Sequence, residues 1–228
     1  LIPEEFHGIP GGGNGTCEQE EQQQEDRCHA VIREDDQPEL RALLTALAGR
    51  VRAGSHPLRC PIALRRALLG LQGMSSEYPE VRGVLAALAS KLPSSASCSA
   101  FQMCARDISW GLYGLKNMKA EYPPVLALVR FLTNQAASCP DSFHAQDVGN
   151  AVFGLKNMSS HRSEVRALAS VLAERVVGCA DSLSPTDIGR TLRGFRSLST
   201  DHIEVRKLLR AVMLRVDDSA ADLDPRSV

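Results

Sequence analysis

One pattern recurs four times along the chain and constrains the fold more than any other sequence feature. The copies read LRRALLGLQGMSSEYPEVR at 64–82, DISWGLYGLKNMKAEYPPVL at 107–126, DVGNAVFGLKNMSSHRSEVR at 147–166 and DIGRTLRGFRSLSTDHIEVR at 187–206. Their recurring glycine falls at Gly70, Gly114, Gly154 and Gly194. A period of about 40 residues, as these positions give, is typical of stacked helical repeats.

Each copy predicts two helices joined by a short turn, which is Ser-rich in three copies, at Ser75-Ser76, Ser159-Ser160 and Ser199-Thr200. The first, which we call the A-type helix, is typified by PTDIGRTLRGFRSL at 185–198. Ser184 is placed to act as its N-cap, Pro185 occupies its first position and Asp187 lies near its positive end. The second, B-type helix begins with PEVR, SEVR or IEVR, which places a glutamate in its first turn.

An additional B-type segment, PELRALLTALAGRV at 38–51, has no A-type helix before it. We therefore expect an all-α fold, an α-solenoid of helix-turn-helix repeats over 38–216, made of one orphan helix and four helical hairpins. Residues 1–37 are expected to form an irregular, acidic, Gly/Gln-rich arm or linker, and residues 217–228 a polar C-terminal tail. The pattern leaves the handedness of the solenoid open.

Glycine and cysteine both recur with the pattern, and each predicts a feature of the packing. A glycine inside a helix costs about 1 kcal/mol relative to alanine, so its return in four copies predicts close helix contact. Cys98, Cys139 and Cys179 recur in phase with the repeat, which favours a small buried packing residue over a metal ligand or a disulfide. The seven cysteines are odd in number and unclustered, as expected in a reducing compartment.

The near-neutral net charge of −1 conceals an asymmetry. Residues 1–37 contain ten acidic residues against Arg27 and Arg33. Residues 38–228 contain 24 basic and 17 acidic residues, a net charge of +7. A basic repeat region permits a polyanionic partner without requiring one.

Several function classes find no support in the sequence. No apolar run approaches the roughly 18–20 residues of a membrane-spanning helix, so we expect no membrane span. The six histidines form no metal-binding spacing, there is no nucleophile elbow, and Gly11–Gly15 lacks the features of a phosphate-binding loop. We expect no enzymatic activity, no cofactor, no metal and no small-molecule substrate.

The segments QDVGNAVFGLKNM (146–158) and RDISWGLYGLKNM (106–118) resemble the A-type helix of octotricopeptide repeats. That family repeats a Leu/Ile-x-Asn-x-Leu/Val-aromatic-Ala/Gly-Leu pattern, and the resemblance covers roughly 60–216. Here the period is slightly longer than in that family, and Asn150 alone keeps the asparagine. The resemblance implies a solenoid that binds single-stranded RNA in a mitochondrion or plastid, reading about one base per repeat.

The A-type positions outside the apolar stripe are then the RNA-binding candidates. One set recurs at Arg66, Trp110, Asn150 and Arg190. A second set recurs two turns later at Gly73, Asn117, Asn157 and Ser197, beside Gln72, Lys116, Lys156 and Arg196, where a cation can meet a phosphate. A solvated helix face would show the same variation as a base-reading site, so both interpretations stay open.

Two further hypotheses concern partners. The protein is expected to act within a ribonucleoprotein such as a ribosome, with single-stranded or ribosomal RNA as its partner. The alternative is a structural subunit of a large organellar complex, held by protein subunits that contact its repeats and residues 1–37. A weaker third candidate, an armadillo-like peptide scaffold, would need an Asn ladder that Asn150 and Asn157 alone do not form.

Overall fold

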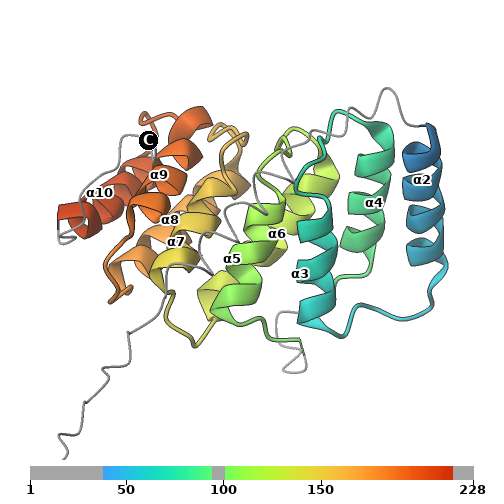
Figure 1. Cartoon of the computed structure of the whole chain (residues 1–228), viewed down its shortest axis with the longest axis horizontal. Coiled ribbons are helices and arrows are strands. Elements are labelled where there is room, and N and C mark those ends of the chain that lie inside the picture. Colours follow the sequence, from blue (N-terminus) through green and yellow to red (C-terminus); the bar gives the residue numbers. More distant parts are fainter. Residues whose placement is uncertain (1–37, 94–100, 218–228) are drawn as a thin grey trace, which may run out of the picture. The chain divides into compact units, whose positions relative to one another are not determined.

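The computed structural model describes residues 38–93 and 101–217, in which all regular secondary structure is helical. The expected all-α class is therefore confirmed for this part of the chain. The predicted arm at 1–37, the C-terminal tail after Asp217 and Cys98 lie outside the described residues. The elements, shown in Figure 1, are α2 (Pro38–Ala53), α3 (Pro61–Gly70), α4 (Pro79–Ser90), α5 (Ala105–Gly114), α6 (Pro123–Ser138), α7 (Ala145–Phe153), α8 (Ser163–Val177), α9 (Pro185–Gly194), the 3₁₀ turn η2 (Phe195–Ser197) and α10 (Ile203–Asp217).

The helices pack in two sequences of neighbours. Helices α3, α5, α7 and α9 pack successively against one another, and we call them the A row. Helices α2, α4, α6, α8 and α10 do the same and form the B row. Helix α2, which corresponds to the orphan sequence copy, therefore contributes to the B row alone.

The predicted helix starts are visible in the capping geometry. The Ser184 hydroxyl accepts a hydrogen bond from the Asp187 backbone N–H at 3.2 Å, and Asp187 accepts one from the Ser184 N–H at 3.3 Å. This capping box confirms the predicted N-cap of α9. Asp147 also accepts from the Ser109 hydroxyl on α5 at 2.6 Å, so this helix-start carboxylate links neighbouring A-row helices as well.

Three of the four recurring glycines lie directly against backbone of the preceding A-row helix. A Cβ on Gly114 would lie 2.5 Å from the Leu68 carbonyl oxygen, and one on Gly194 would lie 2.2 Å from that of Val152. The expected close approach is confirmed there and also at Gly154. It is wrong for Gly70, which has nothing within 4 Å, because α3 is the first A-row helix among residues 38–93 and 101–217 and no preceding A-row helix in these ranges packs against it.

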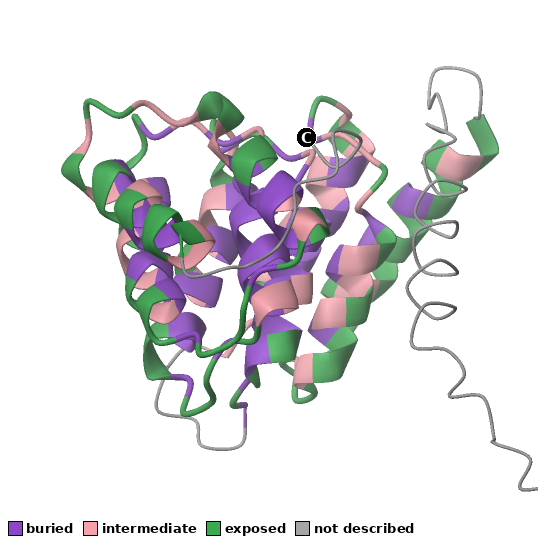
Figure 2. Cartoon of the chain, turned by 60° about the vertical axis from the view of Figure 1, so that its left-hand side comes forward, coloured by how far each residue is buried: buried purple, intermediate pink, exposed green. Residues whose placement is uncertain are grey.

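The core lies between the helices and consists mainly of Leu, Val and Ala. Figure 2 shows buried residues on the surfaces where helices face one another and exposed residues on the outer surfaces. Cys139 and Cys179 are buried, which confirms the predicted packing role for these two. Burial raises the pKa of both thiols.

Candidate nucleic-acid interface

The second set of candidate residues connects each repeat to the one before it. The Asn117 side-chain amide donates to the Gln72 carbonyl at 2.8 Å, and the Asn157 amide donates to the Lys116 carbonyl at 3.0 Å. The Ser197 hydroxyl makes the equivalent bond to the Lys156 carbonyl at 2.8 Å. Each of these three side chains therefore donates a hydrogen bond within the protein. The repeat position that they occupy has a structural role, which the sequence pattern did not predict.

The first set differs from repeat to repeat in accessibility. Arg66 is exposed, whereas Trp110 and Arg190 are partly buried. The indole of Trp110 packs edge-on against Tyr113, and Arg190 Nη1 lies 4.0 Å from Asp187 Oδ1. These three side chains keep some accessible surface on the A row.

Asn150 does not occupy the accessible position expected of it. Its side chain is 0% exposed, and within the described residues neither its amide nitrogen nor its amide oxygen has a hydrogen-bond partner. The expectation that this asparagine lies outside the apolar stripe is wrong, because the helix turns it towards the packed side of α7.

Lys116 is also less accessible than expected. It is only 5% exposed, and its Nζ lies 3.9 Å from the Tyr113 ring centroid and 5.5 Å from that of Phe153. A cation held against two aromatic faces is stabilised by their quadrupoles. The assumption that Lys116 stands free to meet a phosphate is therefore wrong, because the aromatic rings of two successive A-row helices enclose it.

Lys156, one repeat later, has different surroundings. Its Nζ lies 5.3 Å from the Phe153 ring centroid and 3.5 Å from the Asn117 side-chain oxygen. The next helix presents Arg193 where α5 and α7 carry Tyr113 and Phe153, immediately before the recurring glycine. Arg193 therefore takes, beside Lys156, the place that the second aromatic ring, Phe153, has beside Lys116.

Lys156, Arg193 and Arg196 line a pocket of about 470 Å³ together with Leu192. Both arginines are exposed and Lys156 is partly buried. Burial lowers the pKa of Lys156, and the charges of Arg196 and Arg193 lower it further. The sequence patterns singled out Lys156 and Arg196 but missed Arg193, whose signal was a cation at the aromatic position of the repeat.

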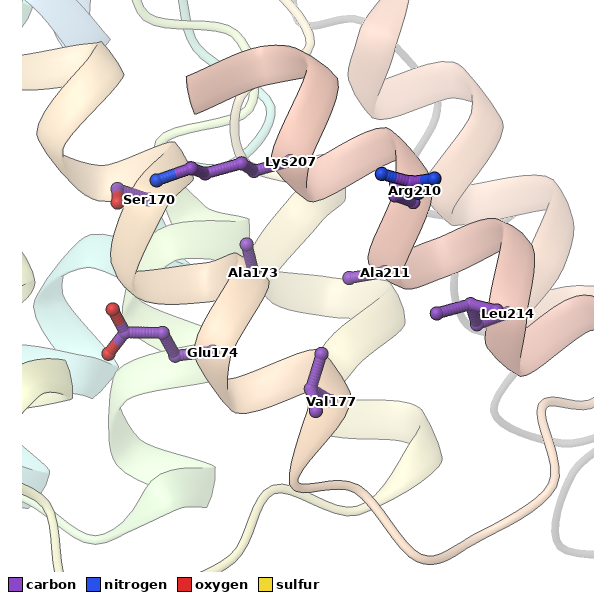
Figure 3. Close-up of a pocket in the computed structure, with 8 residues that line it drawn as sticks. All are labelled: Ser170, Ala173, Glu174, Val177, Lys207, Arg210, Ala211 and Leu214. Carbon is purple, nitrogen blue, oxygen red and sulfur yellow. The ribbon is translucent and has the colours of Figure 1, made fainter. Parts of the chain in front are cut away.

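A second hollow lies between α8 and α10 and is more apolar. It has a volume of about 430 Å³ and is lined by Ser170, Ala173, Glu174, Val177, Lys207, Arg210, Ala211 and Leu214. Figure 3 shows Val177 and Leu214 projecting from the two helices that form this groove. Both side chains are more than half exposed, so the B row has accessible apolar surface here.

Two kinds of site do not occur in the part of the chain that the structure describes. Residues 38–93 and 101–217 contain no group of three or more His, Cys, Asp or Glu arranged to hold a metal ion. None of the helices in these ranges has the length and apolarity needed to cross a bilayer.

Comparison of the chain with protein-family models, with curated protein sequences and with solved structures gave no match in any of the three. The class of the protein therefore rests on its own residues, which define an all-helical, repeat-like architecture.

Proposed function

We propose that this chain is a non-enzymatic RNA-binding protein, an α-solenoid of helical hairpins that holds single-stranded RNA along its A row. The observation that carries the proposal is the group of cations at the end of that row, Lys156, Arg193 and Arg196. Within the described residues no ion pair involves any of them. Cations without carboxylate partners release counterions when they bind a polyanion, which favours nucleic acid.

The remaining accessible side chains fit the same ligand. Arg66 and Arg190 can contact phosphate or base edges, and the partly buried Trp110 offers an aromatic ring for stacking. The side-chain amides of Asn117 and Asn157 are already hydrogen-bonded to the preceding repeat. In this proposal, contacts with the phosphate backbone of the RNA therefore contribute more to the affinity than base reading does. Weak sequence preference and strong dependence on salt are the expected properties.

The setting of this activity is also a proposal. The resemblance of the A-type helices to octotricopeptide repeats supports a mitochondrial or plastid location and a place in a ribonucleoprotein such as a ribosome. In such a particle, residues 1–37 would contact neighbouring protein subunits. These contacts would add to the affinity that the chain has for a short stretch of bound RNA.

A pair of charge reversals tests the proposal. Arg66→Glu/Arg196→Glu alters exposed cations at the two ends of the A row, one on α3 and one in η2 directly after α9. Lys207→Glu/Arg210→Glu makes the same change in net charge on exposed residues of α10. We expect the A-row variant of the full chain to bind single-stranded RNA at least about tenfold more weakly than the α10 variant, measured by fluorescence anisotropy. Equal losses in the two variants would show that net charge alone attracts the RNA.

The groove between α8 and α10 favours a second candidate, a structural subunit that binds protein. Its exposed Val177 and Leu214 provide accessible apolar surface of the kind that a protein contact buries. In this account deletion of residues 1–37, or Leu214→Glu in the full chain, detaches the protein from its native complex, whereas Arg66→Glu/Arg196→Glu does not. Retention of the first two variants in the complex would count against this candidate.

A further inference from the structure

We propose that the pocket formed by Lys156, Arg193 and Arg196 is a phosphate-binding site that takes one phosphate group. The proposal rests on the proposed function where it identifies that group as a backbone phosphate of bound RNA. The site itself follows from the geometry of α7, α9 and η2. No sequence pattern singled out this combination of residues.

The first step is the change in the aromatic position along the A row. In the preceding repeat, the charge of Lys116 is enclosed by Tyr113 of α5 and Phe153 of α7, at 3.9 and 5.5 Å from its Nζ. In the next repeat α9 provides Arg193 instead of a ring, and Arg193 is exposed. The substitution opens the space that a ring would fill and adds a positive charge to it.

The second step is the electrostatic cost of this arrangement. Lys156, Arg193 and Arg196 share the pocket, and burial first, then the charges of Arg196 and Arg193, lower the pKa of Lys156. The Nζ contacts around Lys156 are neutral, namely the Asn117 side-chain oxygen and the Phe153 ring. A bound anion would offset the repulsion among the three cations and accept hydrogen bonds from them.

The third step is the identity of the anion. The pocket, about 470 Å³, has room for a hydrated phosphate group and is open to solvent at the two arginines. Guanidinium groups match phosphate oxygens with two parallel N–H donors, and a lysine adds a point charge. Two arginines at the rim with a lysine at the partly buried base therefore favour a phosphate over a single carboxylate.

The test uses the full chain and single substitutions of exposed arginines. Arg193→Gln removes one charge from the pocket, and Arg50→Gln on α2 is the matched control, since both arginines are exposed and Arg50 lines neither of the two pockets described above. Arg193→Tyr would restore the aromatic position of the earlier repeats and enclose Lys156 as Lys116 is enclosed. Circular dichroism melting of all variants shows whether they are folded before binding is compared.

Two probes separate the possible sources of the phosphate. Inorganic phosphate is titrated by ³¹P NMR, and single-stranded homopolymeric RNA by fluorescence anisotropy. We expect saturable phosphate binding to the wild-type chain, weakened about tenfold or more by Arg193→Gln and Arg193→Tyr and unchanged by Arg50→Gln. RNA binding should weaken in the same two variants and not in the control.

Each outcome decides between the claims. If phosphate binding depends on Arg193 and RNA binding does not, the pocket stands and its phosphate comes from another molecule. If wild-type protein binds phosphate but not RNA, the proposed function fails and the pocket remains. Absence of saturable phosphate binding, or identical behaviour of Arg193→Gln and Arg50→Gln, would overturn the site.

Discussion

A Cβ added to Gly154 would lie 2.4 Å from the carbonyl oxygen of Leu112 on the preceding A-row helix. Real Cβ atoms do not approach backbone this closely, so any larger residue at Gly154 must separate α5 from α7. The recurring glycine thus maintains the spacing between successive A-row helices.

This contact predicts opposite effects of one substitution at two equivalent positions. Gly154→Ala should lower the free energy of unfolding by about 1–3 kcal/mol, because it forces overpacking against backbone. Gly70→Ala should be neutral or raise it by up to about 1 kcal/mol, because nothing lies within 4 Å of that Cβ. Urea denaturation measures both values, and a Gly154→Ala protein as stable as Gly70→Ala would contradict the contact.

The hydrogen bond from Asn157 to the Lys116 carbonyl predicts that this asparagine supports stability. Asn157→Ala should cost about 1 kcal/mol of unfolding free energy, since it leaves the carbonyl without that donor. Asn134→Ala on the exposed side of α6 is the control and should cost less. If Asn157→Ala instead left stability unchanged and weakened RNA binding, the base-reading role expected from the sequence would be restored.

The ion pair between Arg130 and Glu164, 2.8 Å long, predicts a pH-dependent contribution to stability across the B row. The hydrogen bond from Arg130 lowers the pKa of Glu164 below its ordinary value of 4.5. A lowered carboxylate pKa stabilises the folded state above pH 4.5, and this contribution is lost as the pH falls through the folded-state pKa. Thermal melting between pH 6 and pH 3 should therefore show a smaller loss of Tm in Glu164→Gln than in wild type. Parallel curves would show that the pair contributes nothing.

The cysteines should differ in their reactivity. Cys139 and Cys179 are buried and have raised pKa values, whereas Cys60 is exposed. Thiolate is the reactive form, so a brief maleimide pulse at pH 7.5 should label Cys60 well before the other two. Peptide mass spectrometry with and without urea measures the order. Equal labelling of Cys139 and Cys60 in the native protein would contradict the packing described for the end of α6.

The sequence was sufficient to predict the helices because their signals are local. Proline and serine at helix starts and the helical spacing of apolar residues identify α9 from residues 184–198 alone. The close approach at Gly154 was also predictable, because a glycine that recurs at one position of the A-type pattern requires a reason, although Gly154 directly follows the last residue of α7 and does not lie inside it. The lack of such a close contact at Gly70 was not predictable, because it depends on which helix comes first in the A row.

The candidate site was less predictable because accessibility depends on the neighbouring helix. Asn150 and Arg190 occupy equivalent sequence positions, yet Asn150 is fully buried and Arg190 is only partly so. Lys116 and Lys156 are equivalent too, and their different surroundings come from residues one repeat later, Phe153 and Arg193. Sequence periodicity identifies the equivalent positions, but only packing shows what each side chain contacts.

The most direct test of the central claim is the affinity of the full chain for single-stranded RNA as a function of salt, measured by fluorescence anisotropy. If about three phosphates are neutralised along the A row, one in the pocket of Lys156, Arg193 and Arg196 and the others at Arg66 and Arg190, log K should fall with log salt with a slope of about −2. Micromolar or tighter binding at low salt with such a slope would support an RNA-binding A row. No binding at low salt would contradict it.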